Sequence, residues 1–212
     1  MTKEEFIIET SKLGIKLTDK QINQLEQFYN LLIEWNEKIN LTRITSKEEV
    51  YLKHFYDSLT ISKVINLKNS KTLCDVGTGA GFPGIVLKIV YPNLKITLVD
   101  ALQKRVNYLN TIIKELNLDG ITAIHARGED LKEKYDVVTA RAVANIEKLL
   151  KYTMHLVAPN GVFIAMKGNI SEELNDLTRK KISQKYNIVK IEKFLLPYEN
   201  SQRSLLVITN KI

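Results

Sequence analysis

A glycine-rich segment that follows a short apolar run carries the clearest chemical signal in this 212-residue sequence. Residues 72–76 have the apolar character of a buried strand, and Asp75 is the only charged residue among them. Residues 77–84 read GTGAGFPG, in which Pro83 suits the first turn of a following helix because no N–H is needed there. Glycines allow a tight turn and a close approach to a ligand, and a helix N-terminus offers free N–H groups. This segment therefore predicts a nucleotide-binding strand–turn–helix unit.

The glycine segment can be read in two frames that imply different cofactors. Residues 79–84 match G-x-G-x-x-G, which by itself is a weak signal for a dinucleotide. Residues 75–81 are similar to the S-adenosylmethionine turn of class I methyltransferases, in which the acidic residue organises the turn. A buried carboxylate is costly unless it is paired, and a dinucleotide fold has no evident use for Asp75. Asp100 ends the next predicted strand and suits either cofactor, because a carboxylate there can accept both ribose hydroxyls.

The elements that position this turn follow from an alternation of apolar strands and amphipathic helices after residue 70. Such alternation predicts a largely parallel sheet with right-handed crossovers. The last two strands have no helix between them, so we expect an antiparallel hairpin at one edge. A sheet of about seven strands that ends in this way resembles the α/β, Rossmann-like fold of class I S-adenosylmethionine-dependent methyltransferases and favours S-adenosylmethionine. The predicted strands are 72–76, 94–99, 121–125, 135–140, 162–166, 188–194 and 204–209, and the predicted helices are 85–90, 104–116, 146–156 and 171–186.

The first 68 residues have helical periodicity and predict a separate extension. Thr2, Thr18 and Ser46 each precede Glu or Gln by three positions, which is the spacing of a capping box. A long amphipathic helix is predicted from Gln21 to about residue 39, and a second helical stretch covers 51–67. We therefore expect a helical segment, 1–68, packed on a methyltransferase domain, 69–212.

The charge is distributed unevenly along the chain. The first 68 residues hold ten basic and ten acidic side chains, so the remaining residues carry the whole net charge of +7. A basic excess attracts polyanions such as RNA, although a lysine-rich surface can also serve solubility alone. The single cysteine, the absence of a signal-peptide pattern and the absence of a long apolar run lead us to expect a cytoplasmic, metal-free monomer with no membrane association.

Two later positions are candidates for the cofactor site. Gly128 and Glu129 follow the third predicted strand, beside the expected adenine, although an acidic residue also suits a helix start. Arg141 ends the fourth strand, where cofactor and acceptor should meet. It could clamp a carboxylate or a phosphate there, or form a structural ion pair.

The nature of the acceptor is approached by elimination. Carbon-5 of a pyrimidine requires a cysteine nucleophile, but Cys74 lies in the first predicted strand. The loop typical of exocyclic-amine methyltransferases is missing after residue 140, and no set of residues typical of ribose methylation is present, although Lys104 and Lys167 are available as bases. The N7 atom of guanine carries a lone pair and no proton, so it requires neither a nucleophile nor a general base. No catalytic residue is assigned; the candidates are Arg141, Lys167 and His54, and His54 can equally be a structural residue.

Several motifs along the chain resemble one family. They are Trp35-Asn36 with Asn40-Leu41-Thr42, His54-x-x-Asp57-Ser58, the segment 75–84, Val99-Asp100 with Lys104-Arg105-Val106, Thr139-Ala-Arg141-Ala142, Lys167-Gly168, and Leu196-Pro197 with Arg203. This combination resembles the small-subunit ribosomal RNA methyltransferase G (RsmG) family over nearly the whole chain.

The resemblance implies methylation of N7 of one guanine in the 530 loop of 16S rRNA, with S-adenosylmethionine as the cofactor. The partner would be the rRNA or an assembling small ribosomal subunit. The alternatives are a methyltransferase acting on a small molecule and a nicotinamide-dependent or RNA-binding protein. By position the family's cofactor contacts fall on Gly77, Phe82, Gly128, Glu129 and Arg141, to which the turn and ribose arguments add Gly79 and Asp100. Candidate RNA contacts are Asn40, Arg43, His54 and Lys167, with phosphate contacts from the basic half, including Arg179, Lys180 and Lys181.

Overall fold

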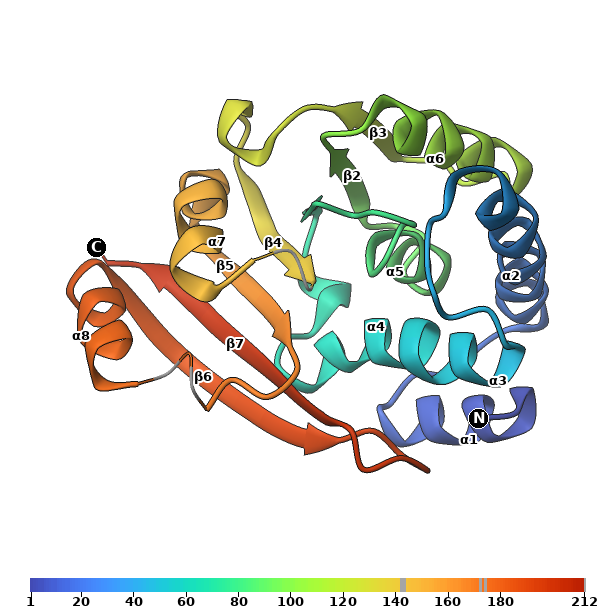
Figure 1. Cartoon of the computed structure of the whole chain (residues 1–212), viewed down its shortest axis with the longest axis horizontal. Helices are drawn as coiled ribbons and strands as arrows, with labels where there is room; N and C mark the ends of the chain where they lie inside the picture. Colours follow the sequence, from blue (N-terminus) through green and yellow to red (C-terminus); the bar gives the residue numbers. More distant parts are fainter. Residues whose placement is uncertain (142–143, 172, 174, 212) are drawn as a thin grey trace.

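The protein is built around one mixed β-sheet (Figure 1). The computed structural model describes residues 1–141, 144–171, 173 and 175–211, without the side chains of 176–179. In this part of the chain seven strands lie in the order β3-β2-β1-β4-β5-β7-β6. The strands are β1 (Thr72–Val76), β2 (Lys95–Asp100), β3 (Ile121–His125), β4 (Tyr135–Arg141), β5 (Val157–Lys167), β6 (Tyr186–Leu195) and β7 (Gln202–Asn210).

The strand pairing confirms the predicted class I methyltransferase architecture. Strands β1 to β5 pair in parallel, whereas β7 pairs antiparallel with both β5 and β6. The predicted antiparallel hairpin of β6 and β7 is therefore present. β7 lies between β5 and β6, and β6 forms the edge of the sheet. The order reverses between β1 and β4, and a crevice at such a switch point lies outside the carboxyl ends of the strands.

Helices cover both faces of the sheet because strand residues alternate between them. Leu73 belongs to a hydrophobic cluster with α5 (Gly84–Val90) and α6 (Gln103–Glu115), whereas Cys74 belongs to a second cluster with α7 (Ile146–Thr153). The second cluster also includes Ile182 of α8 (Asp176–Lys185). Two buried faces explain why the central strands read as nearly continuous apolar runs.

The N-terminal segment folds into α1 (Lys3–Lys12), α2 (Asp19–Ile39), α3 (Lys47–Val50) and the short α4 (Asp57–Leu59). The capping boxes predicted at Thr2 and Thr18 are confirmed. At Ser46 the hydroxyl accepts the N–H of Glu49, and the Glu49 carboxylate accepts the Ser46 hydroxyl instead of its backbone N–H. That box is therefore only half formed.

The N-terminal helices share one core with the sheet. Phe28 of α2 stacks on Phe55, with ring centroids 5.7 Å apart, and also contacts Phe82 of the glycine turn at 5.3 Å. Gln21 donates hydrogen bonds to the carbonyls of Ile89 and Val90 at the end of α5. One hydrophobic cluster contains residues from both 1–68 and 69–212. The predicted division of the chain into these two segments therefore stays a proposal.

Between α3 and α4 the chain forms a π-helical turn, Tyr51–Tyr56, where the sequence predicts an ordinary helix. The N–H of Asp57 donates to the carbonyls of Leu52 and His54. The carbonyl of Lys53, which an α-helix would use at this point, accepts a hydrogen bond from Arg141 instead. Short 3₁₀ turns follow at Thr60–Lys63 and Leu67–Asn69.

Three predicted boundaries are wrong by three residues or more. The predicted strand 162–166 starts too late, because β5 begins at Val157 and runs through residues 159–161, with a register shift against β4. A side chain on Gly161 would lie 2.7 Å from the carbonyl oxygen of Tyr135, so the strand passes very close to β4 there. The predicted helix 146–156 ends at Thr153 and continues as a 3₁₀ turn, and the predicted helix 171–186 begins only at Asp176.

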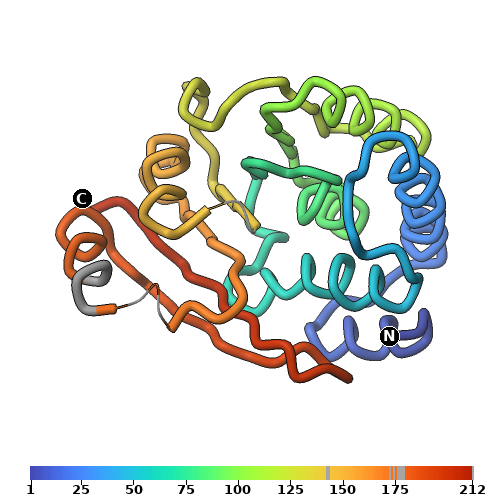
Figure 2. The backbone as a smooth tube through the Cα atoms, viewed as in Figure 1, coloured from blue at the N-terminus to red at the C-terminus, as the bar shows by residue number. Residues whose placement is uncertain are grey.

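The tip of the β6–β7 hairpin lies beside α1, although the two segments are far apart in the sequence (Figure 2). The hydroxyl of Tyr198 donates to the carboxylate of Glu9 at 3.3 Å. The ammonium of Lys53 in the π-helical turn pairs with Glu199 at 3.4 Å. These contacts bring the hairpin, the N-terminal helices and the ends of β4 and β5 around one region.

Candidate active site

The glycine segment forms a compact turn between β1 and α5. Gly77, Gly79 and Gly81 have φ values of 71°, 59° and 93°, which favour glycine because a side chain would be strained there. The N–H groups of Gly77 and Thr78 donate to the carbonyl of Val99, so the turn is fixed to the end of β2. The predicted strand–turn–helix unit is confirmed.

Asp75 organises this turn from inside the protein. One of its oxygens, Oδ2, accepts the Thr78 hydroxyl at 2.7 Å and the N–H of Gly84 at 2.9 Å. Burial raises the pKa of the carboxyl to about 6, while those two hydrogen bonds and Arg141 act in the opposite direction. Its other oxygen, Oδ1, has no hydrogen-bond partner among the described residues. Since Asp75 is completely buried, its role is to hold the turn and not to face the solvent side of the crevice.

Asp100 ties the end of β2 to the same turn. Its carboxylate accepts the N–H of Gly79 at 3.0 Å and that of Leu102 at 2.9 Å, and it pairs with Arg105 at 3.3 Å. The side chain is only 4% exposed. A contact with ribose stays a prediction, and it would use the carboxylate lone pairs that these groups leave free.

The other predicted cofactor residues lie at neighbouring strand ends. Gly128 is buried in a 3₁₀ turn (Gly128–Asp130) after β3, and Glu129 is exposed beside it. The carboxyl ends of β1, β2 and β3 therefore bring together partly exposed glycine backbone and two carboxylates on one side of the sheet. S-adenosylmethionine needs carboxylates that accept hydrogen bonds from its ribose hydroxyls and amine groups beside a glycine turn, so the residues present fit this cofactor.

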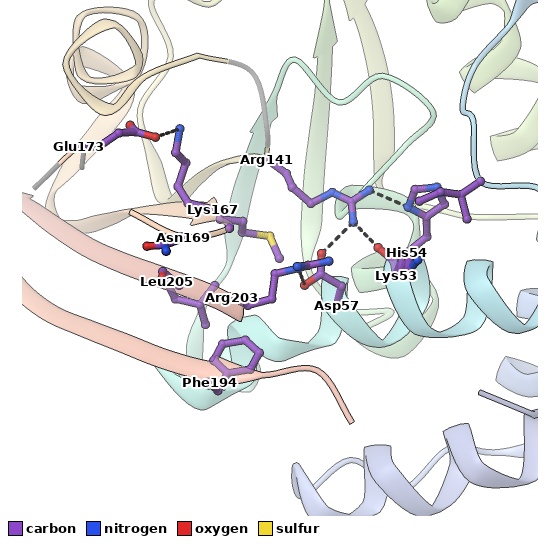
Figure 3. Close-up of a pocket in the computed structure, with 14 residues that line it drawn as sticks. Lys53, His54, Asp57, Arg141, Lys167, Asn169, Glu173, Phe194, Arg203 and Leu205 are labelled. Atoms are coloured by element: carbon purple, nitrogen blue, oxygen red, sulfur yellow. Dashed lines mark hydrogen bonds and ion pairs between the residues drawn. The ribbon is translucent and has the colours of Figure 1, made fainter. Parts of the chain in front are cut away.

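Arg141 connects the glycine turn to the N-terminal segment (Figure 3). Its guanidinium donates to the Lys53 carbonyl at 3.1 Å and to the Asp57 carboxylate at 3.2 Å, and it contacts Nδ1 of His54 at 3.2 Å. It also lies over the ring of Phe82, 5.2 Å from the centroid. The structural ion pair considered from the sequence is thus present, and a cofactor contact of Arg141 stays a prediction.

His54 is held as a neutral ring. Because a guanidinium only donates hydrogen bonds, Nδ1 must accept, and the proton lies on Nε2, which donates to the Thr42 hydroxyl at 3.0 Å. The ring stacks on Phe82, with centroids 4.4 Å apart. Burial and the nearby Arg141 charge lower the pKa of His54 to about 3. Both ring nitrogens are engaged, which favours a structural role.

A cavity of about 400 Å³ opens beside Arg141. Its walls come from the π-helical turn, the ends of β4 and β5, and the hairpin strands. Lys167 lies on the wall opposite His54 (Figure 3), where it pairs with Glu173 at 2.8 Å and donates to the carbonyl of Ala144 at 2.7 Å. The charged and titratable side chains that bear on the chemistry of the cavity are Lys53, His54, Asp57, Arg141, Lys167 and Arg203.

The remaining candidates are not among the residues that line this cavity. Asn40 ends α2 in a left-handed conformation, and Arg43 and Lys104 are exposed. Lys180 and Lys181 are exposed on α8, whereas the side chain of Arg179 and the whole of Ala142 lie outside the described residues.

Asp57 and Arg203 were missed as functional candidates. Asp57 accepts from Arg141 through one oxygen and from Nε of Arg203, at 3.1 Å, through the other. Both residues stand in motifs of the family resemblance, but their pairing joins positions 146 residues apart. No local spacing in the sequence signals such a contact.

The described residues lack a metal-binding cluster and a membrane-spanning helix. They contain no group of three or more His, Cys, Asp or Glu side chains that could hold a metal ion. Within the same residues, no helix has the length and apolar character needed to cross a bilayer.

Comparisons with solved structures show the fold. The chain is similar to a precorrin-6y C5,15-methyltransferase from Geobacter metallireducens GS-15, with a TM-score of 0.56 and 13% identity over 83% of this chain and 96% of that one. It is also similar to M. jannaschii TYW2 in complex with AdoMet, with a TM-score of 0.52 and 18% identity over 68% and 70% of the two chains. At these identities the likeness concerns architecture alone, and it agrees with the class I methyltransferase fold.

Sequence comparisons identify the family. A profile described as "rRNA small subunit methyltransferase G" matches residues 21–205. The "Ribosomal RNA small subunit methyltransferase G" of Bacillus pumilus (strain SAFR-032) is 44% identical over 218 residues, covering 100% of this chain and 91% of the relative. The protein of that name from Lactobacillus helveticus (strain DPC 4571) is 45% identical over 217 residues, covering 98% and 90%. The resemblance seen in the sequence is therefore confirmed, and this chain belongs to the small-subunit ribosomal RNA methyltransferase G family.

Proposed function

We propose that this protein methylates N7 of a guanine in the 530 loop of 16S rRNA, with S-adenosylmethionine as the cofactor. The family membership supports a small-subunit rRNA methyltransferase. The assignment of N7 as the methylated atom is supported by the cavity beside Arg141, because the basic groups of this cavity are already engaged in hydrogen bonds and ion pairs. An acceptor with its own lone pair and no proton to lose needs none of them as a base.

The chemistry of the cavity side chains supports this choice of acceptor. His54 has both ring nitrogens bonded and a pKa lowered to about 3, so it is a poor proton acceptor at neutral pH. Lys167 is paired with Glu173. Burial raises the pKa of the Cys74 thiol, and Cys74 lies in β1 outside the cavity, so it cannot serve as the nucleophile that pyrimidine C5 would require.

The cofactor supplies an electrophilic methyl group when it is bound. Gly77, Gly79, Asp100, Gly128 and Glu129 would hold it along the ends of β1, β2 and β3. Phe82 and Arg141 would border its reactive end, because Phe82 belongs to the glycine turn and Arg141, which lies over its ring, lines the cavity. The protein's contribution is then to place the acceptor in line and to exclude water.

The cavity walls suit a base that has left its stack. Phe194, Met166 and Leu205 supply apolar surface, and Arg141, Arg203 and Lys53 supply positive charge for backbone phosphates. RNA-modifying enzymes commonly bind a flipped nucleotide in such a pocket. We also propose that the protein acts as a monomer in the cytoplasm, where small ribosomal subunits are assembled.

The direct test incubates the protein with methyl-labelled S-adenosylmethionine and either naked small-subunit rRNA or small ribosomal subunits, followed by mapping of the labelled base. We expect label on N7 of one guanine in the 530 loop. Label on an exocyclic amine, a ribose or a pyrimidine would refute the N7 assignment, and label on a small molecule alone would refute an RNA substrate.

A matched control addresses covalent catalysis. The variant Cys74→Ala should retain methylation, because no thiol nucleophile is needed for a purine nitrogen. Loss of transfer in a folded Cys74→Ala protein would indicate a different reaction. Calorimetry against S-adenosylmethionine and NADH separates the cofactor alternatives, since binding of NADH alone would overturn the proposal.

A further inference from the structure

Three groups from the π-helical turn and from Asp57, the residue directly after it, converge on Arg141. The π-helical hydrogen bonding leaves the Lys53 carbonyl free of the N–H of Asp57, and Arg141 donates to that carbonyl. The same turn presents His54 to the guanidinium, and Asp57 at the start of α4 also contacts it. Isolated π-helical turns are uncommon and often mark functional sites. Here the turn supplies one backbone acceptor, the Lys53 carbonyl, that a regular α-helix would pair with the N–H of Asp57.

Asp57 also holds a second arginine from a different strand. Its Oδ2 accepts from Arg141 of β4 and its Oδ1 accepts from Nε of Arg203 of β7. The Asp57 side chain is only 7% exposed, so its charge must be compensated by partners and not by water. Two guanidinium groups this close would repel each other without the carboxylate between them (Figure 3).

The two arginines keep donors for a ligand. A guanidinium has five N–H donors. Arg203 uses one for Asp57 and another for the carbonyl of Gln202. Both arginines line the cavity, so donors not spent on protein acceptors remain for oxygen atoms of an acceptor nucleotide.

We propose that Asp57 is a positioning residue that holds Arg141 and Arg203 as a fixed pair in the acceptor cavity, where they meet the guanine nucleotide to be methylated. This inference rests on the proposed function. Asp57 touches neither cofactor nor acceptor; it acts through the two guanidinium groups. The long-range pairing of β4, β7 and the π-helical turn thus assembles the acceptor site before RNA binds.

The test compares Asp57→Asn with Glu26→Gln in the full-length protein. Glu26 is a matched control because its carboxylate also bridges two donors, Lys47 and Tyr51, outside the cavity. For Asp57→Asn we expect kcat/KM for small-subunit RNA to fall about a hundredfold, as misplacement of binding groups does. Cofactor affinity measured by calorimetry should fall much less than kcat/KM, because Arg141 is only one of the proposed cofactor contacts. Glu26→Gln should retain the wild-type kcat/KM.

A double-variant cycle separates positioning from a general structural effect. Arg203→Gln is measured alone and together with Asp57→Asn. If Asp57 acts through Arg203, the combined loss in kcat/KM is smaller than the product of the two single losses. If Asp57→Asn does not fold, Asp57→Glu goes through the same cycle, since it keeps the charge and moves it.

Each outcome decides between the two proposals. A wild-type protein that places no label on rRNA overturns the proposed function and this inference with it. An active wild type overturns the inference alone if Asp57→Asn matches the Glu26→Gln control, if its cofactor affinity falls in parallel, or if the losses multiply.

Discussion

Arg141 fixes the protonation state of its neighbours as well as their positions. By donating to Nδ1 of His54 it places the histidine proton on Nε2, which then donates to Thr42. The same guanidinium lies over Phe82, on which the His54 ring stacks. A histidine held in this way is an architectural group, which agrees with the proposal that the site places the acceptor and needs no proton transfer by His54.

Gly84 has no room for a side chain. A Cβ there would lie 2.2 Å from Cδ2 of Leu98 and 3.0 Å from Oδ2 of Asp75. We expect Gly84→Ala to lower the free energy of unfolding by about 1–3 kcal/mol, the usual effect of overpacking. Urea denaturation measures the difference. Gly168→Ala is the control, because the nearest atom to its Cβ would be 3.9 Å away, and equal effects of the two variants would contradict the steric argument.

Asp75 should make stability depend on pH in an unusual direction. Burial raises the pKa of its carboxyl from 3.8 to about 6, so the folded state binds this proton more tightly than the unfolded state. The resulting stabilisation is fully present below the unfolded pKa and is lost as the pH rises through about 6. Lowering the pH from 7 to 5 should therefore stabilise the wild type by ~1 kcal/mol relative to Asp75→Asn. Urea denaturation of both proteins at the two pH values gives this difference, and parallel pH dependences would show that Asp75 does not titrate there.

At the scale of elements, the sequence predicts what local patterns encode. The strand Thr72–Val76 and the caps at Thr2 and Thr18 follow from residue types within a few positions of each other, and all three are confirmed. The course of β5 through Gly161 depends on its approach to the carbonyls of β4, and the π-helical turn coincides with a partner, Arg141, that comes from β4. Such features depend on tertiary contacts that periodicity does not contain.

The same distinction applies to the site. The glycine turn was predicted because its residues are contiguous and their backbone conformations need glycine. Arg141 was predicted from its place at a strand end. The carboxylate of Asp57, which pairs Arg141 with Arg203, was not predicted. Asp57 lies 84 positions from Arg141 and 146 from Arg203 in the sequence.

The N-terminal helices should be necessary for folding of the sheet. Removing residues 1–68 would expose Phe82, which is 4% exposed and packs against Phe28 and Phe55. We expect the fragment 69–212 to keep secondary structure without fixed tertiary packing, seen as poor dispersion in NMR spectra and binding of an apolar dye. Adding residues 1–68 as a separate peptide should restore dispersion. A fragment that is well folded alone would show that the N-terminal segment is an independent unit.

On the scale of the whole molecule, the cavity is closed by parts from across the chain. Ile44 and the π-helical turn form one wall, the ends of β4 and β5 another, and Phe194 and Arg203 of the hairpin a third. The hairpin tip is held by Tyr198 on Glu9 and by Glu199 on Lys53. The cavity therefore exists only in the complete fold, although the net positive charge of the chain comes from residues 69–212.

That charge distribution predicts which exposed lysines contribute to RNA binding. Lys180 and Lys181 are exposed on α8 in the basic half, whereas Lys16 and Lys20 are exposed in the charge-balanced first 68 residues. Each phosphate contact contributes about 0.7 to the slope of log affinity against log salt concentration for single-stranded nucleic acid. If both α8 lysines contact phosphates, the double variant Lys180→Ala/Lys181→Ala should bind a 530-loop RNA more weakly, with a slope reduced by about 1.4. Filter binding across a range of salt concentrations measures both quantities. Lys16→Ala/Lys20→Ala removes the same charge and should change neither; equal effects of the two double variants would mean that RNA senses net charge and not a basic face.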